Sequence, residues 1–235
     1  MLLATAASPP PPMFSTMLRG LKELLVQPCC QVCQQPVDQR HAQQDVCPRC
    51  WESIGLPTRP LQGTLPLPWI AAGHYEGRLR SLLLQLRRTR NLAIVRVLSH
   101  QLRDLLPAHA ILVPIPSWKQ SSRANPLPTL LTQALQRPSM PLLIRTSPCF
   151  PQHHLHRQQR WQNSRGTMGC SACAETAVNW GRHQAWIVDD ILTTGATASE
   201  AAETLRRVHV PVAGAVCLAR TPKRRSQQGS KRSTP

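Results

Sequence analysis

Residues 186–205 place the strongest constraint on what this chain can fold into. They begin with three apolar residues, Trp186-Ile187-Val188, which predict a buried strand, and continue with Asp189 and Asp190. A run of Thr and Gly then leads into a segment whose apolar residues recur at helical spacing: Ala198, Ala201, Ala202 and Leu205. We therefore expect a strand, a loop and a helix in this order.

The loop between the expected strand and helix has the composition of a phosphate site. A turn rich in Thr and Gly at a helix start offers unpaired backbone N–H groups, hydroxyl donors and the positive end of the helix dipole. Gly195 lets the backbone approach a ligand closely. Carboxylates would repel a phosphate, so Asp189 and Asp190 better suit the hydroxyls of a phosphorylated sugar, or its Mg²⁺. The alternative is an ordinary strand-to-helix turn capped by Thr.

This stretch resembles the 5-phosphoribosyl-1-pyrophosphate (PRPP) signature of type I phosphoribosyltransferases, in which four apolar residues, two acids and two apolar residues precede Thr-Thr-Gly-x-Thr. The loose fit is at the first apolar position, held by Ala185 or Trp186. The resemblance implies that Asp189 and Asp190 bind the ribose 2′ and 3′ hydroxyls. It also implies that the loop binds the 5′-phosphate through Thr193, Thr194, Gly195, Ala196 and Thr197.

Composition limits the rest of the chain. Its 235 residues suffice for one α/β domain with a small appendage. An apolar content of 41% permits a core, and the net charge of +17 favours anionic partners such as phosphate-bearing ligands or nucleic acid. No acid lies between Asp104 and Glu175. That segment either faces a polyanion such as pyrophosphate or reflects a general bias toward Arg.

No apolar run approaches the roughly 18 residues of a membrane span. Residues 1–7 are apolar but lack a basic flank, and prolines 9–12 follow them, so we do not interpret them as a signal peptide. Residues 1–16 are expected to be a disordered leader or a wrongly assigned start. We expect a cytoplasmic protein.

Two Cys-x-x-Cys pairs, Cys30/Cys33 and Cys47/Cys50, are separated by 13 residues. This spacing lets two tight turns offer four thiolates to a tetrahedral Zn²⁺, and a closed shell of four thiolates indicates a structural metal. Cys29 and His41 are weaker ligand candidates. The alternative is disulfides, which need an oxidising compartment. We expect a double zinc-knuckle domain at 17–56.

Further Cys and His residues carry weaker signals. Cys170 and Cys173 form a third Cys-x-x-Cys pair without a partner pair, and three His residues cluster at 153–156. We interpret both groups as incidental polar or surface residues.

Between these motifs, prolines predict a linker at 57–72. Leucine stripes then predict two helices, over 78–87 and 92–106. Strands are expected at 110–116, 142–144 and 212–218, and a helix at 128–136. Residues 150–173 are predicted to be a mobile polar loop, and 222–235 a disordered basic tail.

The series of motifs resembles the ComF family of phosphoribosyltransferase-like proteins associated with DNA uptake and natural competence. The resemblance covers 17–221, including the knuckles, Tyr75-x-Gly-x-Leu-Arg80 and Val113-Pro-Ile-Pro116. It also includes a pattern met by Gln152, Leu155, Arg160 and Asn163. It implies an α/β fold at 73–221, with a type I phosphoribosyltransferase-like parallel sheet flanked by helices, behind a small N-terminal zinc-knuckle domain.

One segment departs from the family. Members usually carry Arg-Gly-Phe-Asn-Gln after the Val-Pro-x-Pro loop, whereas this chain has Arg123-Ala124-Asn125-Pro126-Leu127. Any function that depends on the Asn at the position of Pro126 is therefore questioned here.

The resemblance also implies roles for site residues. Pro114, Ile115, Lys119 and Arg123 would form a pyrophosphate loop. Gln152, Arg160 and Asn163 would lie on a mobile loop, with Arg160 acting alongside Asp189 and Asp190 in catalysis. Mg²⁺ would accompany PRPP, and a nitrogen nucleophile would displace pyrophosphate from C1.

A rival hypothesis is a non-catalytic component of the DNA-uptake machinery that binds DNA or proteins and uses the nucleotide site as a sensor. Trp51, Trp161 and the basic tail would permit contacts with single-stranded DNA.

Overall fold

The computed structural model describes residues 28–37, 45–117, 124–146, 166–171 and 179–222. Two compact units make up the chain, Met1–Cys47 and Pro48–Pro235. The division falls between the two cysteines of the second pair, so the short helix α2 (Pro48–Ile54) belongs to the second unit. The sequence analysis had placed the end of the knuckle domain later, at 56.

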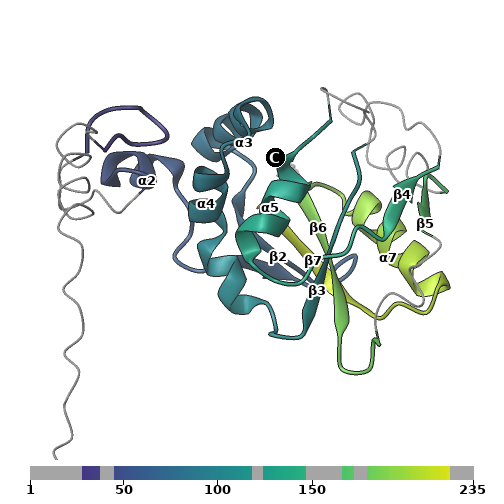
Figure 1. Cartoon of the computed structure of the whole chain (residues 1–235). Coiled ribbons are helices and arrows are strands. Elements are labelled where there is room, and N and C mark those ends of the chain that lie inside the picture. The colour runs from purple at the N-terminus through teal and green to yellow at the C-terminus, as the bar shows by residue number, and fades with distance from the viewer. Residues whose placement is uncertain (1–27, 38–44, 118–123, 147–165, 172–178, 223–235) are drawn as a thin grey trace, which may run out of the picture. The chain divides into compact units, whose positions relative to one another are not determined.

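The second unit contains a five-stranded, mostly parallel sheet with the order β1-β2-β7-β6-β3 (Figure 1). Its strands are β1 (Leu61–Gly63), β2 (Trp69–His74), β3 (Ala110–Pro114), β6 (Gln184–Leu192) and β7 (Val212–Arg220). Only β1 pairs antiparallel within this sheet. A second, antiparallel pair consists of β4 (Leu143–Arg145) and β5 (Met168–Cys170). The expected α/β class with a mostly parallel sheet and helices is confirmed.

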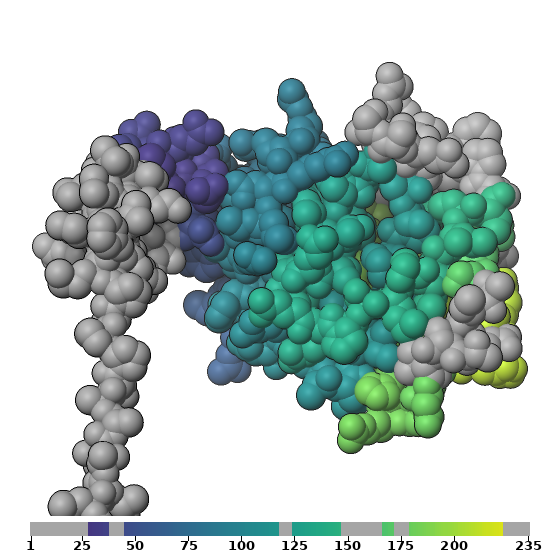
Figure 2. Space-filling model, viewed as in Figure 1, coloured from purple at the N-terminus to yellow at the C-terminus, as the bar shows by residue number. Residues whose placement is uncertain are grey.

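In the described part of the second unit, four helices accompany the sheet: α3 (Gly77–Thr89), α4 (Leu92–Leu105), α5 (Leu127–Leu135) and α7 (Ala196–Arg207). The predicted leucine stripe of α3 is buried through Leu79, Leu82, Leu83 and Leu86. Asn91 caps α4 by accepting the N–H of Ile94 at 3.3 Å. In the space-filling view, the side chains of α4 and α5 hide most of the sheet (Figure 2).

The core lies on both faces of the sheet. On one face, α7 packs its alanines and Leu205 against Ala185 and Ile187 of β6 and against Ala215 and Cys217 of β7. On the other, α4 packs against β2 and β7, and α5 packs against β3, β6 and β7. Small residues on α7 bring its backbone close to the sheet. This closeness matters because the expected phosphate loop joins β6 directly to α7.

Three sequence predictions are wrong in their bounds. The mobile loop predicted at 150–173 contains β5, which pairs with β4. The predicted linker at 57–72 contains β1 and most of β2, which pairs in parallel with β7 inside the sheet. Its prolines did not prevent this because Pro66 and Pro68 precede the first residue of β2, where no ladder donor is lost. The central strand was predicted to end at Val188, but β6 continues through both acids to Leu192.

Several expectations fall outside the described residues. They include residues 1–16, the polar segment 150–165 and the tail 223–235. Within the described part of the chain, no helix has both the length and the apolar character needed to cross a membrane.

Candidate functional site: a cysteine cluster and an acid pair beside a phosphate loop

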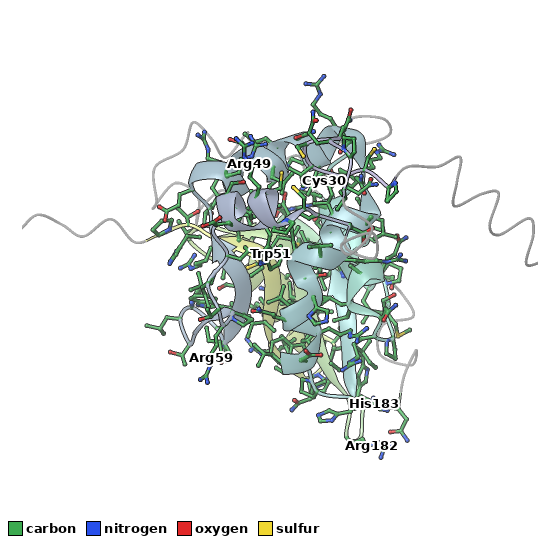
Figure 3. The ribbon with its side chains drawn as sticks, turned by 90° about the vertical axis from the view of Figure 1, so that its left-hand side faces the viewer. Cys30, Arg49, Trp51, Arg59, Arg182 and His183 are labelled. Carbon is green, nitrogen blue, oxygen red and sulfur yellow. The ribbon has the colours of Figure 1, made fainter. Side chains whose placement is uncertain are left out.

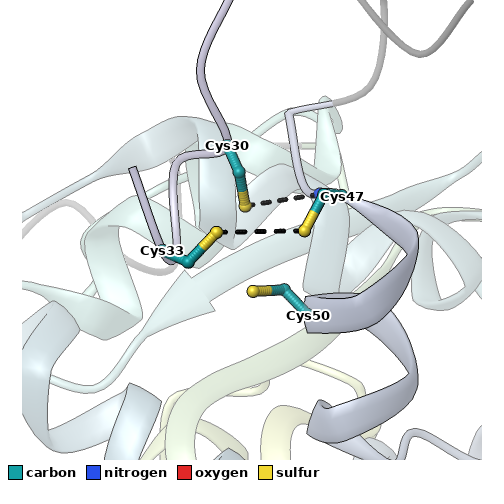
Figure 4. Close-up of side chains that lie close together, drawn as sticks. All are labelled: Cys30, Cys33, Cys47 and Cys50. Carbon is teal, nitrogen blue, oxygen red and sulfur yellow. Dashed lines mark hydrogen bonds between the residues drawn. The ribbon is translucent and has the colours of Figure 1, made fainter. Parts of the chain in front are cut away.

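Four cysteines from the two Cys-x-x-Cys pairs converge (Figure 4). The sulfurs of Cys30, Cys33, Cys47 and Cys50 all lie within 4.8 Å of one another. Tetrahedral zinc with Zn–S bonds of about 2.3 Å requires S–S separations of about 3.8 Å. The Cys33 and Cys47 sulfurs are 3.9 Å apart. The donor set therefore fits a four-thiolate metal centre, and these four cysteines could bind a structural metal such as zinc.

Backbone amides surround the sulfur of Cys30. The N–H groups of Val32 and Cys47 donate to this sulfur at 3.4 and 3.3 Å. Burial opposes ionisation of the thiol, but hydrogen bonds from the backbone of Cys47, Cys33 and Val32 outweigh it and lower the pKa of Cys30 to about 6. A thiolate is the form that binds metal. Cys29 lies outside the group of four, and His41 lies outside the described residues.

The local chain makes the first turn possible. Gln34 adopts a left-handed conformation with φ of 59°, and its N–H donates to the carbonyl of Cys30 at 2.8 Å. Cys29 forms an isolated antiparallel bridge with Pro36, which closes the turn at its base. The turn thus carries both sulfurs of the first pair on a short hydrogen-bonded loop.

The two acids of the expected ribose site lie near the carboxyl end of β6. Successive side chains of a strand leave on opposite faces. Ala185 and Ile187 belong to the cluster packed on α7, and Asp189 continues that alternation. The side chain of Asp190 leaves on the other face, as that of Val188 does. The pair therefore meets two different environments.

Asp190 is almost fully buried and strongly hydrogen bonded. Its Oδ2 accepts Nε and Nη2 of Arg87 at 2.9 and 2.6 Å, and Nδ2 of Asn125 at 2.8 Å. Its Oδ1 accepts the N–H of Ile191 at 2.9 Å. The Arg87 side chain is 38% exposed, whereas that of Asp190 is 6% exposed. Burial alone would lower the pKa of Arg87, but the charge of Asp190 and its hydrogen bonds raise it.

The carboxyl of Asp189 lies in a different electrostatic environment. Burial raises the pKa of its carboxyl to about 8, and the neighbouring Asp190 charge adds to the increase. The N–H of Asp190, which donates to Asp189 Oδ1 at 2.8 Å, and the charge of Arg145 oppose this increase. Burial and the neighbouring acid therefore disfavour the charged form of Asp189.

Asn125 was not predicted as a site residue. The sequence analysis noted that the family's Asn is replaced at position 126. One position earlier, Asn125 bonds to Asp190 through its amide and also accepts the N–H of Leu127 at the start of α5. Its backbone N–H donates to Ser117 at 3.0 Å. A neighbouring Asn therefore does reach the acid pair, and the shift by one position hid it.

The predicted phosphate loop lies between β6 and α7. Gly195 is the N-cap of α7 with φ of 84°, a conformation that disfavours other residues. Thr194 Oγ1 accepts the N–H of Ala196 at 3.3 Å, which leaves its hydroxyl proton to donate elsewhere. Gly195 and Ala196 are buried, whereas Thr193, Thr194 and Thr197 are partly exposed. The loop thus presents three hydroxyl side chains at the N-terminus of a helix.

The expected pyrophosphate loop begins at the carboxyl end of β3, the strand adjacent to β6. Pro114 pairs in register with Val188, and the N–H of Ile115 donates to the carbonyl of Val188 at 2.9 Å. These contacts bring Pro114 and Ile115 next to the acid pair. The other proposed loop residues lie outside the described residues: Lys119, Arg123, Gln152, Arg160 and Asn163.

Other basic and aromatic groups lie apart from the acid pair. Arg182 and His183 directly precede β6, at the end of the strand opposite to the acids (Figure 3). Trp51, considered above for DNA contacts, is 40% exposed on α2. Sequence reasoning also missed Arg87, because a cation on the leucine-rich helix α3 is indistinguishable from ordinary surface charge until the fold brings it to Asp190.

Comparisons with known proteins bear on this site. No protein-family model matches the chain. The chain is similar to the DNA utilization protein YhgH of Salmonella typhi, with 29% identity over 213 residues that cover 82% of this chain and 90% of the relative. The protein of the same name from Salmonella typhimurium is 28% identical with the same coverage. Both relatives are named for the utilization of DNA, which agrees with the DNA-uptake role implied by the ComF resemblance.

The cysteine cluster generates a first prediction. Purified protein should hold one Zn²⁺, and Cys33→Ser or Cys50→Ser should lose it and unfold at lower temperature. Structural zinc contributes roughly 10–16 kcal/mol in isolated peptides, more than a small core could supply. Cys29→Ser is the matched control and should keep the metal. Elemental analysis after dialysis decides, and four thiols found as disulfides without zinc would contradict the assignment.

The raised pKa of Asp189 generates a second prediction. The folded protein binds this proton more tightly than the unfolded chain, so stability is lost as pH rises from the unfolded pKa toward the folded value of about 8. Between about pH 6.5 and 9 the loss should be on the order of 1–2 kcal/mol. Asp189→Asn should remove this loss. Urea unfolding of both proteins across the interval measures the difference, which cancels contributions from the metal site. Parallel curves for the two proteins would refute the raised pKa.

Proposed function

We propose that the second unit of this chain binds PRPP or a related ribose phosphate, and that the protein acts in the utilization or uptake of DNA. The observation that carries the first part is the order of groups at one edge of the sheet. Asp189 and Asp190 lie near the carboxyl end of β6, and the Thr-rich loop that follows leads into α7 through Gly195, which has a left-handed conformation. Ligands of open α/β sheets bind at the carboxyl ends of the strands.

The roles within this proposal follow from charge. The loop and the N-terminus of α7 attract a phosphate dianion through donors and the helix dipole. The acids accept hydrogen bonds from the ribose hydroxyls, where a carboxylate is a favourable partner and a phosphate would be repelled. In ribose 5-phosphate, the phosphate is separated from the 2′ and 3′ hydroxyls by the length of the sugar. It therefore suits a site in which the phosphate donors of the loop are separate from the acceptors, which are the two acids.

The Mg²⁺ expected with PRPP needs a different location from Asp190 Oδ2. That oxygen already accepts three donors from Arg87 and Asn125, and the raised pKa of Asp189 disfavours the charged form that a cation would need. Mg²⁺ in phosphate sites is commonly bound by few carboxylates together with phosphate oxygens and water. We therefore assign most of its ligands to the diphosphate of PRPP.

If the protein is an enzyme, the reaction is displacement of pyrophosphate from C1 of the ribose by a nitrogen nucleophile. Pro114 and Ile115, at the end of β3, support a pyrophosphate loop that would include Lys119 and Arg123. Arg160, with Gln152 and Asn163, would close over the departing group. Positioning and charge stabilisation would supply most of the rate.

The second part of the proposal rests on similarity to the two DNA utilization proteins, which extends over 82% of the chain. The net charge of +17 favours a polyanionic partner. In the alternative function, the protein is a non-catalytic component that binds single-stranded DNA or DNA-uptake proteins and senses a nucleotide. A cytoplasmic location is part of the proposal, since reduced thiols are needed for the metal centre.

A third prediction tests the ribose phosphate site. Asp190→Asn should weaken ribose 5-phosphate or PRPP by about 10- to 150-fold, the worth of a hydrogen bond to a charged group, and Asp189→Asn should weaken them less, because the raised pKa of Asp189 favours its neutral form. Asp190→Asn should spare inorganic phosphate or strengthen it, because it removes negative charge, and Asp189→Asn should change phosphate binding little. Thr194→Val should weaken all three ligands. Calorimetric titration measures each, with thermal unfolding as the control for folding. A wild type that binds none of these ligands would refute the site.

A fourth prediction concerns DNA. Residues 223–235 contain five Lys and Arg, so a variant with all five changed to Gln should bind DNA more weakly and with less dependence on salt. Each lost phosphate contact lowers the log–log salt slope by about 0.9 on duplex and about 0.7 on single strands. Fluorescence anisotropy at several salt concentrations measures the slope. An unchanged slope would show that the tail makes no phosphate contacts.

A further inference from the structure

The base of the proposed phosphate loop is held by a buried arginine at the end of β7. Arg220 is 8% exposed, and its Nη1 donates to the carbonyl of Leu192 at 2.7 Å and also to the carbonyl of Thr193. Leu192 is the last residue of β6 and Thr193 the first residue of the loop. A single guanidinium nitrogen therefore spans the junction at which the strand becomes the loop.

Holding these carbonyls has a consequence for the loop amides. Adjacent carbonyls directed at one cation fix the orientation of two successive peptide units, because each peptide is planar. The N–H of Thr221 also donates to the carbonyl of Leu192 at 3.0 Å. With both carbonyls directed at Arg220, the peptide N–H groups that follow them point away from it. An anion on the other side of the loop needs donors in that orientation.

Arg220 is itself held by Trp69, the first residue of β2. Its guanidinium lies over the Trp69 ring, 5.2 Å from the ring centroid, a favourable position for a desolvated cation. The indole N–H of Trp69 donates to the carbonyl of Leu65 at 3.1 Å. Pro66, which follows Leu65, contacts the loop at Gly195, since a Cβ built on Gly195 would lie 2.5 Å from Pro66 Cγ.

We propose that Arg220 is a positioning residue of the phosphate loop, with Trp69 holding its guanidinium in place. This inference rests on the proposed ribose phosphate function and identifies the residue that gives the loop its shape before a ligand arrives. Pre-organised donors bind an anion without the cost of ordering the loop. The buried positive charge next to the loop also favours a phosphate dianion.

The test combines two readouts on the full-length protein. Arg220→Met removes the charge and the donors but keeps much of the side-chain length, and Arg220→Lys restores the charge and a donor. Arg206→Met, an exposed change in the last turn of α7, is the matched control. Amide hydrogen exchange of residues 193–198 reports the loop without any ligand, and calorimetry reports the affinity for inorganic phosphate and ribose 5-phosphate.

Arg220→Met should speed exchange in the loop while β2 and β3 keep wild-type protection. It should weaken both ligands by about tenfold or more, as expected when a binding group is misplaced. Arg220→Lys should recover most of both effects, and Arg206→Met should resemble the wild type. Should Arg220→Met not fold, Arg220→Gln is measured in its place, since it keeps a neutral donor.

The proposal would be overturned if amide hydrogen exchange of the loop in Arg220→Met or Arg220→Gln matched that of the wild type. It would also be overturned if the phosphate affinity of the variant stayed within about twofold of the wild type. A wild type that binds neither ligand would overturn the proposed function instead. Loop exchange would then decide by itself whether Arg220 holds the loop.

Discussion

The side chains of adjacent residues in a β-strand point to opposite faces of the sheet, and the candidate site depends on this constraint. Asp189 and Asp190 share one motif but not one environment. Asp190 meets Arg87 and Asn125, whereas Asp189 follows the residues that pack on α7. The result is one carboxylate neutralised by a cation and one carboxyl whose burial raises its pKa to about 8. Two identical side chains thereby acquire different electrostatic environments.

The cations that shape the site come from three distant parts of the chain. Arg87 lies on α3, Arg145 on β4 and Arg220 at the end of β7. Arg87 bonds Asp190, Arg145 acts on Asp189 through its charge, and Arg220 bonds the backbone at the start of the loop. Arg145 also bonds the carbonyl of Pro116, next to the expected pyrophosphate loop. The acids and the loop are contiguous in sequence, but the charges that tune them are assembled by the sheet.

This division explains what could be predicted from the sequence. Helical leucine spacing predicted α3 and α4, and the order of apolar residues, acids and Thr predicted β6, the loop and α7. Cysteine spacing predicted the cluster of four. The strand that pairs with β2 is β7, which is distant in the sequence. For this reason β2 was not predicted within the proline-rich segment 57–72. Asn125 was missed because the family motif was compared position by position. Such a comparison cannot show that the side-chain amide of a neighbouring residue reaches Asp190.

The charge of the site limits the ligands that suit it. The charges of Arg87 and Asp190 nearly cancel in their ion pair, and the raised pKa of Asp189 disfavours a second negative charge, so the acid pair has little net attraction for a free divalent cation. The same near-cancellation weakens its repulsion of a phosphate bound to the neighbouring loop. A carboxylate accepts hydrogen bonds from hydroxyls, and a protonated carboxyl can also donate one. A sugar phosphate, the ligand that we propose, would satisfy both halves of this site, whereas inorganic phosphate would engage the loop alone.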